Sequence, residues 1–317
     1  MRVKYNIDTA ILFQIGDPLD QSCAAYLHNA MYEYANINAV SLDVHVKQGE
    51  LGAFVEAAKS LKIKGFDITM PHKTEIIKYL DECDPLSRAF KSVNHVNIVD
   101  GKLIGIGFDG KGMAIAIEEN VDTLQGKSAL IIGAGSVAGA IAAELCAAGV
   151  NHIMIVNRTK EKSQYIEKTL HEFFDVKVEV GDWTAEAFNQ FAAKADVVVQ
   201  CTSLGMEGSG TDLPFMDFVN YIPQGSICAD VLYPATPFLK AAQARGIQTV
   251  DGTMMLYAQQ LATMEFHFGV KLSKDVFREA EEAVAIAVAT SPIWKASCTA
   301  ARSAPRRWPC ARCAINT

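Results

Sequence analysis

The most constraining feature of the chain is a short segment at residues 129–139, where an apolar run breaks into a Gly-x-Gly turn and continues as an alanine-rich stretch. A buried strand that turns through two glycines into a helix is typical of a dinucleotide-binding unit. The segment begins mid-chain, so roughly 120 residues precede it, which is enough for a separate domain. The sequence therefore predicts a dinucleotide-binding domain preceded by a domain that could hold the molecule being oxidised or reduced.

Each residue of this turn has a separate expected role. Gly133 lets the chain leave the strand in a tight turn, and Gly135 removes a Cβ so that a pyrophosphate can approach the backbone. Small residues at positions 138 and 139 let the helix pack on the sheet, and the helix N-terminus attracts negative charge. The alternative is a strand-to-helix turn that binds no ligand. We expect cofactor contacts at Gly133, Ala134, Gly135, Ser136, Val137 and Ala138.

The end of the next expected strand, residues 152–156, bears on which dinucleotide binds. An enzyme that reads the free ribose 2′-hydroxyl of NAD carries an acidic residue there, whereas this chain has Asn157-Arg158-Thr159. The guanidinium of Arg158 and the ammonium of Lys162, one helical turn later, suit a 2′-phosphate. These residues favour NADP over NAD, the alternative being a solvated pair of surface cations.

Composition places the chain among ordinary globular proteins. Of its 317 residues, 50% are hydrophobic and 21% charged, and the formal net charge of −7 argues against a nucleic-acid partner. The N-terminus is too polar for a signal peptide, and no apolar run approaches a membrane span, so we expect a cytoplasmic protein with no membrane partner. The cysteines lack the spacing of a disulfide framework or a metal site, so no metal is expected.

Residues 291–317 differ from the rest of the chain. They hold five basic residues and no acidic one, and they show neither helical nor strand periodicity. Cys310 and Cys313 have zinc-knuckle spacing, but the segment supplies no histidine and only one further cysteine. We interpret the segment as a disordered or aberrant tail and exclude it from the fold.

Hydrophobic periodicity predicts an α/β protein throughout. Strands at residues 10–15, 39–46 and 63–69 alternate with helices at 24–35 and 49–61, and Asp100-Gly101 joins a hairpin. From residue 128 the alternation predicts a Rossmann-like doubly wound parallel sheet. We expect a smaller α/β substrate-binding and catalytic domain at 1–109, an NADP-binding domain at 110–250, a cleft between them, and helices at 251–290 that pack back on the first domain.

Two residues could carry the chemistry of hydride transfer, which requires a group that protonates the developing alkoxide. Lys73 follows a strand and Pro71, and Asp109 lies at the junction of the expected domains. A lysine and a carboxylate that meet in a cleft can share and pass a proton. Taken singly, Lys73 could instead be a surface cation at a helix start and Asp109 a helix N-cap.

Together these stretches resemble the shikimate dehydrogenase family and its quinate-using relatives, over about residues 10–285. The similarity rests on ordered motifs spread along the chain. They are Gly16-Asp17-Pro18-Leu19 with Ser22 and His28-Asn29, Thr69 to Lys73, Ser92 to Asn94, Asp109-Gly110, Gly133 to Gly139, Asn157 to Thr159, Thr202 to Met206, Asp230 to Thr236, and Gly252 to Gln259.

The resemblance implies an NADPH-dependent, reversible reduction of 3-dehydroshikimate to shikimate, a step of chorismate and aromatic amino acid biosynthesis. Lys73 and Asp109 would be the catalytic pair at the reacting hydroxyl of this small cyclic hydroxy acid. Such a polyhydroxylated acid needs short, directional hydrogen-bonding groups rather than an apolar pocket. The implied contacts are Thr69, Asn94 and Gln259 with the ring hydroxyls, and Ser22 and Tyr233 with the carboxylate.

The resemblance also extends the cofactor site beyond the glycine turn. Met206 and Met255 would pack near the nicotinamide. The further implied cofactor contacts are Asn157, Arg158, Thr159, Lys162, Thr202, Ser203, Val231 and Gly252.

Three positions depart from the family pattern and leave the substrate open. Ala24 lacks a second hydroxyl for the carboxylate, Phe108 stands where a smaller polar residue is usual, and His95 replaces a threonine. Quinate or a related cyclic hydroxy acid is therefore an alternative substrate. The chain could also be a non-catalytic NADPH-sensing protein or a folate-type dehydrogenase, which likewise places a lysine-bearing domain beside a Rossmann unit. We expect a monomer or a homodimer.

Overall fold

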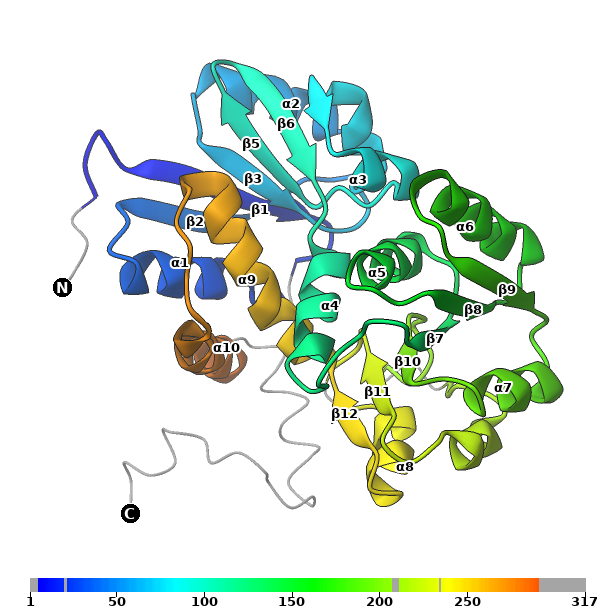
Figure 1. The fold of residues 1–317 in the computed structure, drawn as a ribbon. Helices are drawn as coiled ribbons and strands as arrows, with labels where there is room; N and C mark the ends of the chain where they lie inside the picture. The colour runs from blue at the N-terminus through cyan, green and yellow to red at the C-terminus, as the bar shows by residue number, and fades with distance from the viewer. Residues whose placement is uncertain (1–4, 20–21, 207–210, 234, 291–317) are drawn as a thin grey trace, which may run out of the picture.

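The computed structural model describes residues 5–19, 22–206, 211–233 and 235–290. Two six-stranded sheets stand in separate parts of the molecule, each flanked by helices (Figure 1). The expected tail at 291–317 lies outside the described residues. The two-sheet α/β architecture predicted from periodicity is confirmed.

The first sheet has the strand order β2-β1-β3-β5-β6-β4. Its three leading strands are parallel, β5 is antiparallel to β3 and β6, and the short β4 pairs with β6. Helix α1 (Ala24–Tyr34) covers one face and α2 (Leu51–Ser60) the other, because their apolar residues join two different core clusters. The strands are β1 (Ala10–Gly16), β2 (Ala39–His45), β3 (Gly65–Ile68), β4 (Glu82–Cys83), β5 (His95–Val99) and β6 (Lys102–Ile106).

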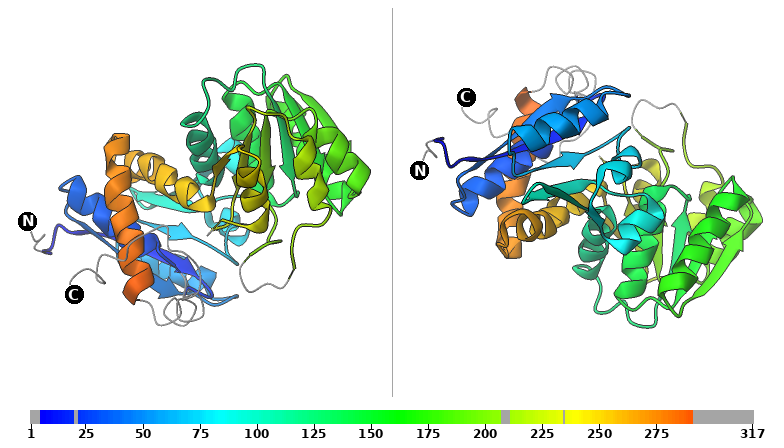
Figure 2. Two further views of the ribbon diagram at one scale, coloured as in Figure 1. Left: turned by 90° about the horizontal axis from the view of Figure 1, so that it is seen from below. Right: turned by 90° about the horizontal axis from the view of Figure 1, so that it is seen from above.

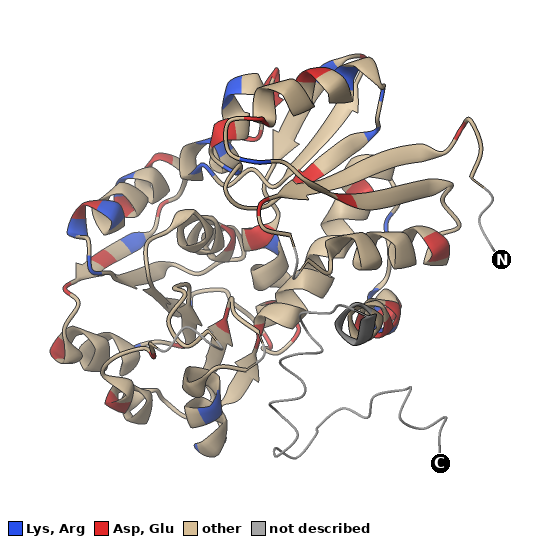
Figure 3. Ribbon diagram, turned by 180° about the vertical axis from the view of Figure 1, so that it is seen from behind, with Lys and Arg blue, Asp and Glu red and all other residues tan. Residues whose placement is uncertain are grey.

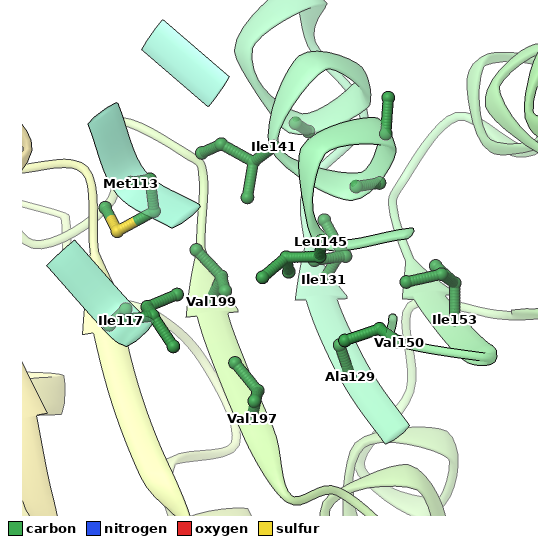
Figure 4. Close-up of a cluster of buried hydrophobic side chains, with 14 of the residues drawn as sticks. Met113, Ile117, Ala129, Ile131, Ile141, Leu145, Val150, Ile153, Val197 and Val199 are labelled. Atoms are coloured by element: carbon green, nitrogen blue, oxygen red, sulfur yellow. The ribbon is translucent and has the colours of Figure 1, made fainter. Parts of the chain in front are cut away.

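The second sheet is wholly parallel, with the order β12-β11-β10-β7-β8-β9. This is the doubly wound arrangement, in which the chain starts at the centre and builds outward in both directions. Buried side chains fill both of its faces, and Figure 4 shows one of the two layers. The strands are β7 (Ser128–Ile132), β8 (His152–Val156), β9 (Lys177–Gly181), β10 (Val197–Gln200), β11 (Ile227–Asp230) and β12 (Gln248–Val250), and the helices α5 (Ser136–Ala147), α6 (Lys160–Phe173), α7 (Ala185–Ala192) and α8 (Pro237–Ala244).

Two helices join the two sheets, and a third packs beside the first sheet. Helix α4 (Asp109–Glu118) packs between α5 and α9 (Gly252–Phe268), and its residues Met113 and Ile117 enter the core of the second sheet (Figure 4). Helix α9 runs back to the first sheet, where the Asn97 amide donates a hydrogen bond to the carbonyl of Phe266 at 3.2 Å. Helix α10 (Phe277–Thr290) lies against α1, as Figure 2 shows from two sides.

Most expected elements are present, and the differences lie in short segments between them. The 3-10 helix η1 (Glu75–Tyr79), strand β4 and helix α3 (Pro85–Phe90) have too few residues to show a period. The expected role of Gly139 in packing on the sheet is wrong. A Cβ at this position would lie 2.3 Å from the ring of Phe90, so the glycine allows α5 to approach α3 of the first domain.

Charged residues of both signs are interspersed along the exposed helices of the face seen in Figure 3. Within the described ranges, no helix has the length and apolarity needed to cross a membrane.

Substitution of Ile131 by alanine tests the core of the second sheet. Ile131 is fully buried, and we expect its truncation to lower the free energy of unfolding by about 2–5 kcal/mol, since it removes apolar contacts and leaves a cavity. Urea denaturation measures the change. Leu61→Ala is the matched control, because Leu61 is 69% exposed and should change stability by less than about 0.5 kcal/mol. Equal effects of the two substitutions would contradict the packing described.

Candidate active site

The candidate site forms where the first sheet meets helices α4 and α9. Lys73 follows β3 in a turn that contains Pro71, just before η1. Asp109 is the first residue of α4, three residues after β6 ends. The two residues are 36 positions apart in the chain, and the fold brings their side chains into direct contact.

Asp109 is the centre of a hydrogen-bonded group. The Lys73 ammonium donates to Asp109 Oδ2 at 2.5 Å, while the amides of Asn94 and Gln259 donate to Oδ1 at 3.0 Å and 3.3 Å. The Asp109 side chain is 7% exposed and that of Lys73 is 21% exposed. Both carboxylate oxygens therefore have partners, and the lysine keeps some access to solvent.

Asn94 fixes the position of the Asp109 carboxylate. Its side-chain oxygen accepts the backbone N–H of Phe108 at 2.8 Å, and its own backbone N–H donates to the carbonyl of Ile106. Phe108, not Asp109, occupies the N-cap position of α4. The alternative interpretation of Asp109 as a helix cap is therefore wrong, because its carboxylate binds side chains from three other segments.

This arrangement can exchange a proton with a bound hydroxyl. An ammonium that donates to a buried carboxylate is held in one position and keeps two further N–H bonds for other acceptors. A ligand hydroxyl beside Lys73 could give up or receive a proton there. The two amides keep the carboxylate oriented without adding charge.

The other predicted substrate residues come from separate segments around this group. Thr69 is half-buried and directly follows β3. The Ser22 hydroxyl precedes α1 and donates to the Asp43 carboxylate at 3.3 Å. Tyr233 follows β11 of the second sheet, and burial, followed by the nearby Cys23 thiol, raises the pKa of its hydroxyl to about 12. Ser22 and Tyr233 thus come from the two sides of the domain junction and lie near the start of α1.

The glycine turn has the geometry expected of a pyrophosphate site. Gly133 has a φ of +106°, a conformation that L side chains rarely adopt, and its N–H donates to the carbonyl of Val156 at 2.8 Å. Gly135 is the N-cap residue of α5, and a Cβ there would meet no atom within 4 Å. The turn therefore leaves space for a ligand at a helix N-terminus, beside the residues at the end of β8.

The residues that follow β8 are open to solvent. Arg158, Thr159 and Lys162 are all exposed, and Asn157 donates from its amide to the carbonyl of Thr159 at 2.8 Å. Within the described part of the chain, neither Arg158 nor Lys162 forms an ion pair with a carboxylate. Their charges are therefore available to an anionic ligand beside the glycine turn.

The loop after β10 is held by one buried side chain. The Gln200 amide donates to the carbonyls of Thr202 at 3.2 Å and Leu204 at 2.9 Å, and its oxygen accepts the N–H of Thr202. Ser203 and Met206 of this loop are exposed, and the structure describes nothing of residues 207–210. Gln200 thus anchors the loop that carries the predicted cofactor residues.

Helix α9 links the cofactor and substrate sides. Gly252 begins the helix against Val231, and its N–H donates to the carbonyl of Leu232 at 3.0 Å. Met255 lies one helical turn before Gln259, which donates to Asp109. The predicted nicotinamide contact and a ligand of the central carboxylate therefore lie on one face of the same helix.

Two buried acids to which the sequence analysis gave no role support segments of the site. The first, Asp230, accepts hydrogen bonds from the Thr236 hydroxyl at 2.7 Å and the Leu232 N–H at 2.9 Å, and burial raises its pKa to about 7. It shapes the loop that carries Tyr233. The fixed spacing of Asp230, Tyr233 and Thr236 was the available signal.

The second, Asp67 on β3, is surrounded by three buried histidines. His28 Nδ1 lies 3.2 Å from one carboxylate oxygen, and His95 Nδ1 and His267 Nε2, the latter at 3.3 Å, contact the other. Burial raises the pKa of Asp67, but the charges of His95 and His28 and the hydrogen bonds from His267 and His95 outweigh it and hold the pKa well below its usual value. An acid within an apolar strand was the available signal.

The Asp67 group also has the composition of a metal site, which the sequence did not lead us to expect. Ligand-type atoms of Asp67, His95 and His267 lie within 4.8 Å of one another. The imidazole nitrogens touch the carboxylate directly, as in a hydrogen-bonded network of histidines around one carboxylate. The ring of His95 also packs against that of Phe108 at 5.0 Å, so this network supports the residue that precedes Asp109.

A cavity of about 550 Å³ opens elsewhere, between α1 and α10. Its lining includes Tyr26, Glu33 and Glu279, and none of the predicted site residues. It is therefore separate from the Lys73–Asp109 site.

Comparison with known protein families agrees with this geometry. Residues 14–96 match the model of the shikimate dehydrogenase substrate binding domain, and residues 116–206 match that of shikimate / quinate 5-dehydrogenase. The chain belongs to the shikimate dehydrogenase family. The first match includes Lys73 and Asn94, and the second includes the glycine turn and Arg158, so this family's two models cover both sides of the site.

Individual relatives cover nearly the whole described chain. The shikimate dehydrogenase (NADP(+)) of Desulforamulus reducens is 32% identical over 87% of this chain and 95% of its own length. The ligand-free 5-ketofructose reductase of a Gluconobacter species has a TM-score of 0.78 at 30% identity, covering 87% of this chain and 99% of its own. Shikimate 5-dehydrogenase of Listeria monocytogenes, solved with shikimate and NAD, has a TM-score of 0.80 at 27% identity, covering 88% and 98%.

Acidification tests the Asp67 network. Burial lowers the pKa of His28 from 6.5 to about 4. Between these two pH values His28 is protonated in the unfolded chain but not in the native protein, so the native protein loses stability as the pH falls. The depressed pKa of Asp67 adds a further loss of stability below pH 4. We expect the melting temperature to fall steadily from pH 6.5 to 4, as followed by circular dichroism.

His28→Asn is expected to melt at a lower temperature at pH 7 and to depend less on pH between 6.5 and 4. His45→Asn is the matched control, because the His45 side chain is 53% exposed and should leave the wild-type pH dependence in place. A wild-type melting temperature that does not change over this range would contradict the network.

Proposed function

We propose that this protein is an NADP-dependent oxidoreductase that reversibly reduces 3-dehydroshikimate to shikimate. The observation that carries the proposal is the 2.5 Å contact between Lys73 and Asp109, held by Asn94 and Gln259 at the domain junction. A proton-transfer pair in this place is what reduction of a ring ketone requires. Membership of the shikimate dehydrogenase family supports the same reaction.

Residues of the chain transfer the proton and orient the substrate. NADPH, when bound, supplies the hydride that reduces the ketone carbon. Lys73 donates a proton to the oxygen that becomes the hydroxyl, and in the reverse direction it accepts that proton. Asp109 holds the ammonium toward the substrate, while Asn94 and Gln259 fix the position of the carboxylate.

The cofactor assignment is supported by the glycine turn and the cations beside it. Gly133 and Gly135 leave room for the pyrophosphate at the N-terminus of α5, and Arg158 and Lys162 are exposed next to it. Met255 would border the nicotinamide, one helical turn from the residue that binds Asp109. The D. reducens relative is named for NADP(+), which agrees with the absence of an acid at the end of β8.

The substrate is proposed to be a small cyclic hydroxy acid held by Thr69, Asn94, Gln259, Ser22 and Tyr233. Relatives with other named activities, such as the Gluconobacter 5-ketofructose reductase, make a substrate panel necessary. Turnover of NADPH or NADP should be compared for shikimate, 3-dehydroshikimate, quinate, aminoshikimate and 5-ketofructose. The proposal expects shikimate and 3-dehydroshikimate to be turned over, and it fails if neither is.

A non-catalytic NADPH sensor is less well supported. A sensor has no need of Lys73 and Asp109 in contact at the domain junction. We further propose a cytoplasmic location, since the cysteines of the described ranges are free thiols and disulfides are uncommon in that compartment. A monomer or homodimer is proposed, and sedimentation analysis would distinguish them.

Replacement of Lys73 by alanine tests the proton-transfer role. We expect kcat to fall by about 100- to 10,000-fold with a much smaller change in KM, because the lost group acts mainly in the transition state. Lys78→Ala is the matched control, since Lys78 lies nearby on η1 with its side chain 70% exposed. Near-normal turnover by Lys73→Ala would remove its proposed role.

Replacement of Arg158 by alanine tests the choice of cofactor. Loss of a charged hydrogen bond to the 2′-phosphate should lower kcat/KM for NADPH by about ten- to hundredfold and leave that for NADH nearly unchanged. Lys168→Ala on the helix that follows is the control, because the Lys168 side chain is 79% exposed and distant in sequence from the glycine turn. Equal losses with both cofactors would argue against 2′-phosphate recognition.

A further inference from the structure

The start of helix α1 carries the groups that could hold the far end of a substrate. Ser22 and Cys23 precede the helix, and Tyr233 of the second domain lies close enough that the Cys23 thiol affects its pKa. The N–H groups of a helix N-terminus, together with a hydroxyl, would ordinarily attract an anion. Whether this end of the site binds an anion depends on whether those N–H and hydroxyl donors are free.

In this chain the donors are already used by an internal carboxylate. The Ser22 hydroxyl, which has a single proton, donates to Asp43 Oδ1 at 3.3 Å and accepts the N–H of Ala24 at 3.2 Å. Asp43 also accepts the backbone N–H of Ala25. The residue at position 24 has no hydroxyl to add. Asp43 thus takes the place that a ligand carboxylate would occupy.

Among the described residues, no permanent cation offsets the charge of Asp43. Within the described ranges, neither a lysine nor an arginine forms an ion pair with Asp43. His45 acts on Asp43 electrostatically, but it is half-exposed and faces Asp17 at 3.6 Å. A ligand carboxylate at the start of α1 would therefore meet a like charge, which disfavours it.

Asp43 lies on the same face of the first sheet as the Asp67 network. Asp43 pairs with Gln14, Gln14 with Asp67, and Asp67 with His95 in adjacent strands, so their side chains share one face. Thr69 follows Asp67 by two residues and points the same way. The row of polar residues thus runs from the exposed Asp43 across this face to Asp67, where His28 of α1 and His267 of α9 cover it.

We infer that the Ser22–Tyr233 end of the site favours an uncharged hydrogen-bond donor over a carboxylate, so that the enzyme acts on neutral polyhydroxylated ring ketones in addition to 3-dehydroshikimate. The inference rests on the proposed function for the redox step at Lys73. Asp43 accepts a hydrogen bond from a hydroxyl or amide of such a substrate, and the Tyr233 hydroxyl provides a donor on the opposite side. Asp43 is the residue that determines this preference.

The test compares shikimate with its primary carboxamide, which has nearly the same shape but no charge. For the wild-type enzyme with NADP, kcat/KM for the amide should equal or exceed that for shikimate. Asp43→Asn should shift the ratio toward shikimate by about tenfold or more, because the like charge is gone. Asp122→Asn, an exposed acid in the loop before β7, is the matched control and should leave the ratio unchanged.

A second readout does not depend on the folding of the variant. Because salt screens charge repulsion, KM for shikimate should fall as ionic strength rises from about 0.01 to about 0.5 M, whereas KM for the amide should stay constant. A wild-type preference for shikimate of more than about tenfold that Asp43→Asn does not alter would overturn the inference and leave the proposed function intact.

If neither compound is turned over, the proposed function fails, and calorimetric binding of the two compounds to the NADP-loaded protein still decides the inference. Tighter binding of the amide supports it, and tighter binding of shikimate overturns it.

Discussion

The site depends on how a single carboxylate, that of Asp109, is held. A buried carboxylate is costly unless its oxygens are satisfied, and here an ammonium and two amides from three separate segments satisfy them. Each partner is in turn fixed by the fold: Lys73 by the turn after β3, Asn94 by its bond to Phe108, and Gln259 by α9. The domain junction is therefore organised around one negative charge.

Three carboxylates of the first domain illustrate how different partners produce different functions. Asp109 is paired with a cation and so can take part in proton transfer. Asp67 is surrounded by histidines and supports the segment around Phe108 without reaching the solvent. Asp43 accepts hydrogen bonds from a hydroxyl and a helix N–H, and we propose that it disfavours anionic ligands. We propose that the same chemical group thus serves catalysis, stability and specificity at these three positions.

Some of this could be predicted from the sequence because the signal is local. The turn at Gly133 and Gly135 and the apolar strands around it give a strong period, and the structure confirms the doubly wound sheet. The contact between Lys73 and Asp109 could not be derived from spacing, since no local rule joins residues 36 positions apart; it was expected only through the resemblance to a family. The Asp67 network was not predicted for the same reason, because His28 and His267 come from opposite ends of the chain. Gly139 was misjudged because its neighbour, Phe90, belongs to the other domain.

The central claim is that Lys73 and Asp109 act as one unit at the reacting hydroxyl. A double-mutant cycle tests it directly, by measuring kcat for Lys73→Ala, Asp109→Asn and the double variant with shikimate and NADP. We predict that the double variant is about as slow as the slower single variant, because either substitution alone disables the unit. Losses that multiply in the double variant, or single variants that keep near-normal turnover, would contradict the account.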